Sequence, residues 1–558
     1  MCAAGVPTSR RTARFAAHER TLAVHVSQSL RRRGVAALAA AALAAPLMLA
    51  SSTGASASPD PAKKGEQLAR KLVKRAEADD AKWHLRVFQA LADISDGNRA
   101  AGSQGHDLSA WYVGTLLRGA GYDVTYQEFE FTYVETLAEK LHVVSPDARE
   151  VPVRLMTYTQ STPEGGLEAP VAAVPEDDST GCEAADFAGG DYTGNIALIQ
   201  RGACTFAQKQ QNAADAGAVG AIVYNNTEGE LNGTLGGPDA ARIPTGGVSQ
   251  ADGRALAAAA ADGKVVVNLE VRELQEERTT SNVLAETRGG DAANTVMLGA
   301  HLDGVSEGPG INDNGSGTAG LLEAALELAR ADRHGKHENK VRFAFWSAEE
   351  LGLIGSEHYV AELSEAQREE IALYLNFDMI ASPNYGLFVY DGDDSDGVGA
   401  GPGPAGSAEI EAGINGFMDR AGYAPRGTDF TGRSDYGPFI AVDIPSGGTF
   451  TGAEGVKTPE QAELWGGEAG VAYDPCYHAA CDDLDNISMA AFDANVNVIA
   501  HAVGTYAWDT SPVDAAVAKG AKEAKSKSKS LTSPSPENGA EGEHIHGGAH
   551  AGCGEVTE

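Results

Sequence analysis

The sequence predicts an α/β fold, a three-layer sandwich with a mixed, mostly parallel central sheet and a small β-rich insert. Two observations support this prediction. From residue 281 onwards, apolar runs of strand length alternate with amphipathic stretches of helix length, which is typical of parallel sheets. Residues 133–274 instead have short strands and are rich in Val, Ala, Gly and Thr, and these residues therefore form the insert.

The elements follow in order along the chain. Leu85, Phe88 and Ala92 recur at helical spacing and predict one helix over 63–93. A glycine-bounded loop over 97–102, a helix over 108–117 and a strand over 123–131 come next. Within the insert, strands over 195–200 and 218–224 flank a helix over 206–216. The second half alternates strands over 295–300, 341–346, 373–377 and 387–390 with helices over 317–330 and 352–363 and a last helix over 489–506.

These elements divide the chain into four parts. The α/β domain is discontinuous, over 66–132 and 275–511, because residues 133–274 interrupt it. Residues 512–558 are Lys-, Ser-, Gly- and Glu-rich and hold too little apolar surface to fold, so a disordered tail is expected. Its histidines, His544, His546 and His550, are interpreted as solvated rather than metal-binding.

Residues 1–57 are interpreted as an N-terminal extension with a signal peptide. Arg31 to Arg33 form a positive region, residues 35–50 are apolar, and 55–57 form a small-residue cleavage motif. The competing interpretation is a transmembrane anchor, but the apolar run is short and no stop-transfer flank follows it. We therefore expect a secreted, extracellular protein with no membrane partner.

Composition restricts the possible partners of the protein. The 558 residues carry a net charge of −35, which argues against nucleic-acid binding and favours either simple solubility or a site that concentrates cations. In an exported protein, the cysteines close in sequence are expected to form local disulfides, Cys182 with Cys204 and Cys476 with Cys481.

Metal-ligand residue types follow the predicted strands, where α/β sheets place their ligand sites. Two histidines and three carboxylates can hold two zinc ions, since zinc accepts both nitrogen and oxygen ligands. Asp313 is the candidate bridge between the ions. His301 and Asp378 would complete one site, and Glu350 and His478 the other. Singly, each residue could instead be a helix cap or a turn residue; their joint occurrence favours a metal centre.

Three more residues have expected roles in this chemistry. Glu349 is left without a metal and would act as general base, taking a proton from a metal-bridging water so that the resulting hydroxide attacks a peptide carbonyl. Tyr477 would stabilise the oxyanion, and Asp303 would orient the imidazole of His301.

The stretch from His301 to Cys481 resembles the secreted bacterial double-zinc, leucine-preferring aminopeptidases. The motifs that carry the resemblance are 299–303 (GAHLD), 310–317 (GINDNGSG), 347–352 (SAEELG), 375–379 (LNFDM) and 476–478 (CYH). The resemblance extends back to the Gly-Asn-Arg motif at 97–99. The resemblance implies the five zinc ligands, the base Glu349, the oxyanion role of Tyr477 and the Cys476–Cys481 disulfide.

The resemblance also implies a substrate pocket and a second domain. Segments 432–435 and 450–452 resemble the pocket segments, so Arg433 and Phe450 are candidates for binding the first residue of a substrate, while Tyr436 stands where the family often has His. Calcium binding near Asp493 is left open, because Asn497 stands where an acid is expected. The insert resembles a protease-associated domain, through 194–202, 204–206 and 216–221.

The function expected is a monomeric dizinc aminopeptidase that acts on peptide or protein N-termini and prefers large hydrophobic residues there. A carboxypeptidase of the same fold would need a cation for the terminal carboxylate of its substrate, and Arg433 could serve. A glutaminyl cyclase would need one zinc ion, and a metal-free binding ectodomain would have a broken ligand set. Both sets of ligands are complete here.

Overall fold

The computed structural model describes residues 60–177 and 179–531 of the chain. The expected signal peptide and the three tail histidines lie outside these residues. Three helices begin the described part: α2 (Pro61–Val73), α3 (Ala78–Asp93) and α4 (Gln104–Ala120). The single helix expected over 63–93 is thus two helices. Basic residues Arg70 and Lys71 end the first and acidic residues Asp79 and Asp80 begin the second, as the helix dipole favours.

The main domain is built on a mixed sheet in the order β14-β13-β15-β12-β10-β11-β9, with β1 paired to β9 at the end. Strands β10, β11, β12 and β15 are parallel neighbours. Strand β9 pairs antiparallel with β11, and β13 pairs antiparallel with β15 but parallel with β14. The strands are β9 (Val266–Glu286), β10 (Asp291–His301), β11 (Asn339–Trp346), β12 (Ile371–Phe377), β13 (Phe388–Tyr390), β14 (Arg426–Thr428) and β15 (Ser446–Phe450). The expected mixed, mostly parallel sheet is confirmed.

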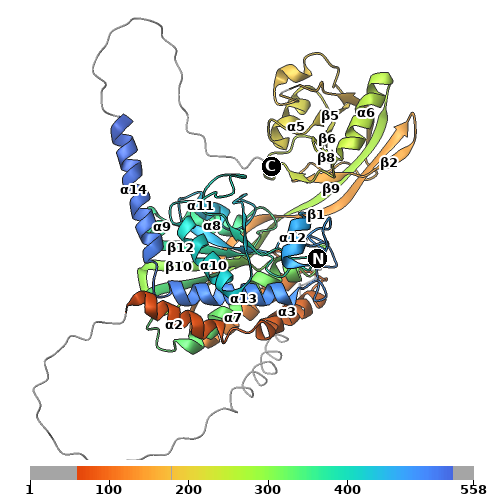
Figure 1. Cartoon of the computed structure of the whole chain (residues 1–558). Coiled ribbons are helices and arrows are strands. Elements are labelled where there is room, and N and C mark those ends of the chain that lie inside the picture. The colour runs from red at the N-terminus through yellow and green to blue at the C-terminus, as the bar shows by residue number, and fades with distance from the viewer. Residues whose placement is uncertain (1–59, 178, 532–558) are drawn as a thin grey trace, which may run out of the picture. The chain divides into compact units, whose positions relative to one another are not determined.

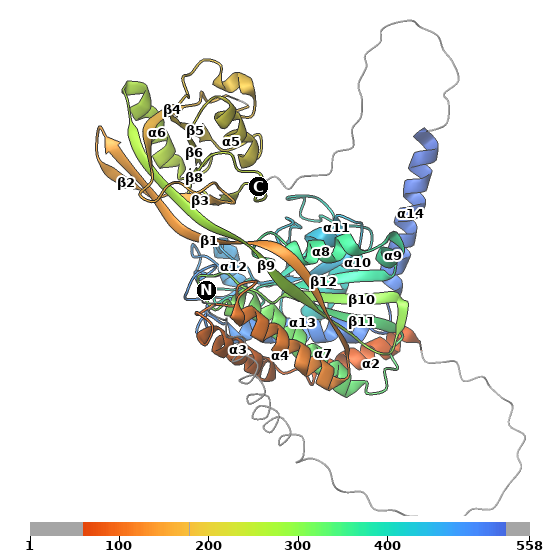
Figure 2. The ribbon, with the colours of Figure 1, turned by 180° about the vertical axis from the view of Figure 1, so that it is seen from behind.

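Helices cover both faces of this sheet, which confirms the three-layer sandwich (Figures 1 and 2). Alternate residues of one strand face opposite layers: Val296 and Leu298 pack in the larger core with α2, α3, α4, α7, α10 and α13, and Met297 packs with α8 and α11. The remaining helices of the domain are α7 (Gly317–Ala331), α8 (Ile354–Glu362), α9 (Glu365–Glu369), α10 (Ser407–Ala421), α11 (Gly437–Ile440), α12 (Pro459–Trp465) and α13 (Met489–Tyr506).

A long two-stranded ribbon connects the main sheet to the inserted domain (Figure 2). Strand β1 runs over Asp123–Ser145, well past the expected end at residue 131, and pairs antiparallel with β9 along nearly its whole length. At the root of the ribbon, Phe129 and Phe131 pack against Ala348, in the loop that follows β11. The domain boundaries expected at 132/133 and 274/275 therefore fall inside continuous strands.

The inserted domain has its own sheet, reached through β9. Strands β4, β5, β6 and β8 are parallel neighbours in it, and their apolar side chains form separate cores with α5 and α6. Its elements are β2 (Arg149–Val151), β3 (Arg154–Thr157), β4 (Leu167–Ala173), η1 (Ala184–Phe187), β5 (Ile196–Gln200), α5 (Phe206–Asp215), β6 (Gly220–Tyr224), β7 (Gly233–Thr234), β8 (Thr245–Val248) and α6 (Gln250–Asp262).

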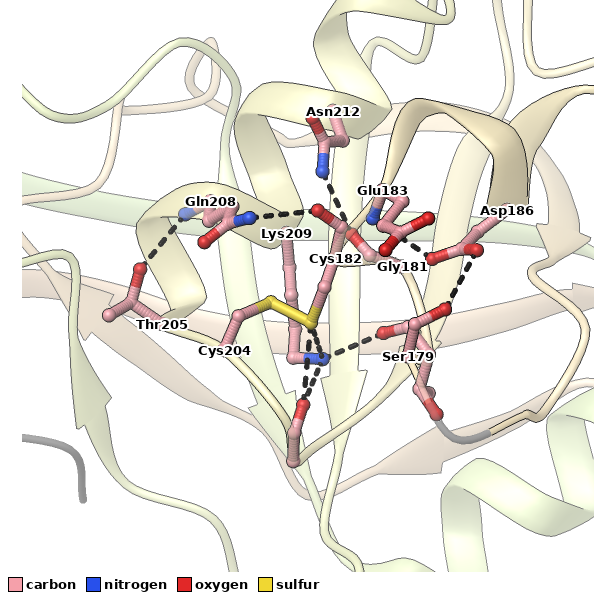
Figure 3. Close-up of a disulfide and its surroundings, with 12 residues drawn as sticks. Ser179, Gly181, Cys182, Glu183, Asp186, Cys204, Thr205, Gln208, Lys209 and Asn212 are labelled. Carbon is pink, nitrogen blue, oxygen red and sulfur yellow. Dashed lines mark hydrogen bonds between the residues drawn. A yellow bond between two sulfur atoms is a disulfide. The ribbon is translucent and has the colours of Figure 1, made fainter. Parts of the chain in front are cut away.

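The Cys182–Cys204 disulfide is formed, and it lies beside a buried lysine (Figure 3). Lys209, on α5, has no exposed surface, and its ammonium donates to the carbonyl oxygens of Thr180 at 2.7 Å and Gly202 at 2.6 Å. A buried ammonium group is tolerated only where such acceptors replace water. Lys209 therefore ties together the two segments that the disulfide also joins.

Helix α14 (Ser511–Leu531) corrects the expectation of a disordered tail from residue 512. Val513 is buried in the larger core, and the Thr510 hydroxyl donates to Asp514 in the first turn at 2.8 Å. These contacts anchor the first turn of α14, although the later residues of the helix are too polar for the sequence to predict an ordered element. No helix among residues 60–177 and 179–531 is both long and apolar enough to cross a membrane.

Replacing Lys209 with Met is expected to destabilise the inserted domain by at least about 2 kcal/mol, because one buried and one partly buried carbonyl group lose their donor. Urea unfolding of the full chain, with hydrogen exchange of the α5 amides, measures this. Lys264→Met is the matched control, since Lys264 is an exposed lysine of the same domain. Equal stability of the two variants would contradict the structural role assigned to Lys209.

Candidate metal centre

Parallel strands bring the candidate ligands to one edge of the sheet. His301 is the last residue of β10, Glu349 and Glu350 lie in the loop after β11, and Asp378 directly follows β12. Because β10 is parallel to both neighbours, the three carboxyl ends meet. Asp313 lies in the irregular turn η2 (Ile311–Ser316), which leads into α7.

Asp313 lies between two histidines. One of its carboxylate oxygens is 3.3 Å from His301 Nε2, and the other is 3.3 Å from His478 Nε2. His301 Nε2 is also 3.1 Å from Asp378 Oδ1, and His478 Nε2 is 2.9 Å from Glu350 Oε2. The five predicted ligands thus form two groups that share Asp313, as a bridging carboxylate requires.

The donor set fits cations. His301, Asp313 and Glu350 offer ligand atoms within 4.8 Å of one another, and so do His301, Glu349 and Asp378. Oxygen Oε1 of Glu350 is buried and has no hydrogen-bond partner within the part of the chain that the structure describes. Crowded, mostly buried carboxylates with an unsatisfied oxygen are costly without a cation, so these residues suit metal ions.

Electrostatics in the metal-free centre reflects this crowding. Burial, followed by the charge of Asp313, raises the pKa of Glu350 to about 7. Burial lowers the pKa of His478, but the Glu350 charge and hydrogen bonds to Asp313 and Glu350 outweigh it and raise that pKa to about 11. Burial also raises the pKa of Glu349 well above its ordinary value. The carboxylates of the centre therefore favour positive charge near them.

The centre opens to solvent on one side. Of the His478 side chain, 39% is exposed, whereas His301 is 1% exposed and Asp313 7%.

Ala348, Met379 and His478 adopt positive φ angles of 59°, 46° and 54°, which are uncommon for residues other than glycine. Each is either a predicted ligand or the neighbour of a predicted functional residue, and backbone strain of this kind clusters at functional sites.

Asp303 lies next to His301, with its Oδ1 3.7 Å from His301 Nδ1, and its carboxylate also contacts another loop. Its carbonyl oxygen is 3.2 Å from His301 Nδ1 and so orients the ring. The carboxylate accepts from the backbone N–H groups of Glu349 at 3.3 Å and Glu350 at 3.4 Å. Asp303 therefore also positions the loop that carries Glu349 and Glu350, a role that its sequence position did not indicate.

Tyr477 and Arg433 meet at the rim. The Tyr477 ring stacks on His478 with centroids 3.8 Å apart, and its hydroxyl is 3.5 Å from Nη2 of Arg433. The Arg433 guanidinium also donates to Glu454 at 2.7 Å. Burial, with the charges of Asp313 and Glu350, raises the pKa of Tyr477 well above its ordinary value, so its hydroxyl stays protonated.

Phe450 ends β15, and its ring lies 6.4 Å from that of Phe388, which also contacts Trp465 and Tyr473. Tyr436, by contrast, is 1% exposed and packs on Tyr390 in the smaller core. The structure therefore places Tyr436 in the core rather than in a pocket.

Two residues that hold the ligand segments were missed. The Ser434 hydroxyl donates to Asp378 Oδ2 at 2.6 Å. Arg99 has no exposed surface and donates to the carbonyl oxygens of Leu302, Pro309 and Gly310, in the segment between His301 and Asp313. Burial lowers the pKa of Arg99 to about 10, so it keeps its charge. The Gly-Asn-Arg motif was the sequence feature that could have indicated Arg99.

Other candidate cation sites are weaker. Asp493 accepts from Nδ2 of Asn497 at 3.3 Å, and among the described residues it joins no group of three close metal-ligand side chains. Asp391, Asp393 and Glu411 do form such a group. Backbone N–H groups of the same loop already donate to Asp391 and Glu411, so this group is explained by loop structure.

The geometry agrees with comparisons to known proteins. The model of Peptidase family M28 matches residues 282–503, and the PA domain model matches residues 167–256. The chain is 47% identical over 438 residues to the probable leucine aminopeptidase 2 of Arthroderma benhamiae, covering 78% of this chain and 85% of that one. It is 43% identical over 442 residues to the probable lipoprotein aminopeptidase LpqL of Mycobacterium tuberculosis, covering 78% and 86%.

Solved structures also resemble it. An aminopeptidase from Aneurinibacillus superposes with a TM-score of 0.62 at 30% identity, over 78% of this chain and 95% of that chain. BSAP, a zinc aminopeptidase from Bacillus subtilis, superposes with a TM-score of 0.54 at 27% identity, over 76% and 94%.

The metal-free protein is expected to lose stability as the pH rises from 7 to 9.5. The pKa of His478 is raised above its ordinary 6.5, so its contribution is complete below about pH 6.5 and is lost as the pH approaches 11. The raised pKa of Glu350 also makes the folded state less stable as the pH rises, but at lower pH, between 4.5 and about 7. Thermal unfolding of chelator-treated protein measures the effect.

The same pH series on the His478→Gln variant separates the contribution of His478 from that of the other groups. The melting temperature of the variant should fall less steeply with pH than that of the wild type. A melting temperature that rises with pH, or an unchanged slope in the variant, would contradict the assignment.

Proposed function

This chain belongs to peptidase family M28 and is a metallo-aminopeptidase with an inserted PA domain, and we propose that it uses two zinc ions to remove N-terminal residues from peptides. The observation that carries the two-ion proposal is the position of Asp313, with one carboxylate oxygen toward each histidine. A single-ion site would not need a carboxylate placed between two sets of donors.

Five residues would hold the ions. His301, Asp313 and Asp378 would hold one, and Asp313, Glu350 and His478 the other. Zinc bound there supplies Lewis-acid chemistry, which polarises a peptide carbonyl and lowers the pKa of water.

Glu349 and Tyr477 are the proposed catalytic residues. The Glu349 side chain is 10% exposed, and its Oε2 lies 3.8 Å from His301 Nε2, so it borders the ligand cluster. From there it can take a proton from the attacking water and return it to the leaving amine. The Tyr477 hydroxyl, which stays protonated, can donate to the oxyanion that develops on the substrate carbonyl.

The charges around the centre favour amino-terminal over carboxy-terminal cleavage. Carboxylates dominate the cluster and can accept a terminal ammonium group. Arg433, at the rim, is already paired with Glu454 at 2.7 Å and so is less suited to hold a terminal carboxylate. Phe450, with the aromatic residues packed around Phe388, supports a preference for large hydrophobic N-terminal residues.

Secretion and the role of the PA domain are also proposals. Two disulfides, Cys182–Cys204 and Cys476–Cys481, support an oxidising, extracellular location. The ribbon root packs against the loop that carries Glu349 and Glu350, which supports an influence of the PA domain on substrate access. We expect the protein to act as a monomer, without nucleic-acid or membrane partners.

A peptide panel tests the reaction. Purified protein is expected to hydrolyse peptides with free N-termini, to spare their N-acetylated forms, to lose activity with a chelator and to regain it with zinc. Cleavage of acetylated peptides from the carboxyl end would establish a carboxypeptidase instead. Zinc-independent turnover, or none, would refute the proposal.

Glu349→Gln tests the general base. The variant is expected to bind zinc normally while kcat falls by about 10²- to 10⁴-fold, the range for a lost acid–base group. Glu369→Gln is the matched control, because Glu369 is an exposed glutamate at the end of α9. A Glu349→Gln variant with control-level kcat would remove Glu349 from the mechanism.

A further inference from the structure

The loop that carries His478 binds the turn that carries Asp313 at two points. Its two ends are the buried aspartates Asp474 and Asp482, which are 1% and 2% exposed. Between them, the Cys476–Cys481 disulfide closes a short ring that contains His478. The two aspartates contact neighbouring groups of the Asp313 turn, but in different ways.

Asp482 holds the backbone of the turn. Its Oδ1 accepts from the N–H of Asn312 at 2.8 Å, and its Oδ2 accepts from the N–H of Asp313 at 2.9 Å. The carbonyl oxygen of Asp482 also accepts from the N–H of Ile311 at 3.1 Å. Three consecutive amides of the turn therefore donate to one residue, which leaves the Asp313 backbone little freedom to rotate.

Asp474 holds a side chain of the turn instead. Its Oδ2 accepts from Nδ2 of Asn312 at 2.6 Å, and its Oδ1 accepts from the N–H of Cys476 at 2.8 Å. Asn486 donates to both aspartates and links the two contacts. Asp474 thus fixes the loop to the turn without contacting Asp313.

We propose that Asp482 is a positioning residue that sets the affinity of the centre for both metal ions, by fixing the Asp313 carboxylate between His301 and His478. This inference rests on the proposed two-zinc site. Because Asp313 would contact both ions, a shift of its backbone should weaken both sites together, whereas loss of a ligand such as His478 should weaken one.

The proposed role differs from that of a residue that merely stabilises the loop. A general loosening of the loop would move His478 and disturb mainly one ion. It would also follow equally from loss of Asp474, since either aspartate anchors the loop to the turn. The two explanations therefore make different predictions for metal binding by matched variants.

The test is a two-site zinc titration of the full chain against a chromophoric chelator. Asp482→Asn keeps only one acceptor oxygen and turns an NH₂ group toward an N–H donor. Both zinc dissociation constants are expected to rise in parallel by about 10- to 100-fold, as for other residues that orient metal ligands. Asp474→Asn is expected to have a smaller effect, and exposed Asp485→Asn none.

Unchanged dissociation constants in Asp482→Asn, loss of only one ion, or equal effects of the Asp474 and Asp482 variants would overturn the proposal. If Asp482→Asn shows no cooperative unfolding, Asp482→Glu is measured instead. Both zinc dissociation constants of that variant are expected to rise in parallel, by less than in Asp482→Asn, and unchanged constants would overturn the proposal. Wild-type protein that binds fewer than two zinc ions would instead refute the proposed function on which this inference depends.

Discussion

Mutual repulsion among buried carboxylates is the constraint on which the rest of the structure depends. Asp313, Glu349, Glu350 and Asp378 meet at the carboxyl end of the sheet with side chains at most 13% exposed. Like charges in a medium of low dielectric constant persist only where other groups offset their cost. His301 and His478 lie among these carboxylates, and the Ser434 hydroxyl donates to Asp378, so these groups offset part of the cost.

Segments distant in sequence supply the groups that hold the ligands. Asp303 accepts from the amides of the Glu349–Glu350 loop, Ser434 donates to Asp378, and Arg99 holds the segment between His301 and Asp313. Each contact restricts a loop rather than a strand. The sheet provides a common edge, and these buried polar contacts set the position of each ligand on it.

The inserted domain is joined to the main domain by continuous strands rather than by linkers. Strands β1 and β9 belong to both sheets, and Phe129, Phe131 and Tyr133 at the ribbon root pack with Ala348, which precedes Glu349. The ribbon root therefore contacts the loop of the proposed general base directly.

The sequence by itself determined the fold class, the insert and the five candidate ligands, because each rests on local patterns: alternating apolar periods, and ligand residue types placed after predicted strands. It could not show that residues 74–77 break the first helix, that β1 extends to Ser145, or that α14 begins at Ser511, since tertiary contacts decide those ends. Nor could it reveal Arg99, Ser434 or Asp482, which act through backbone and side-chain groups far away in sequence. The order of apolar and ligand-type residues is a local feature of the chain, whereas the ends of these elements and the partners of buried polar groups depend on which segments the folded sheet brings together.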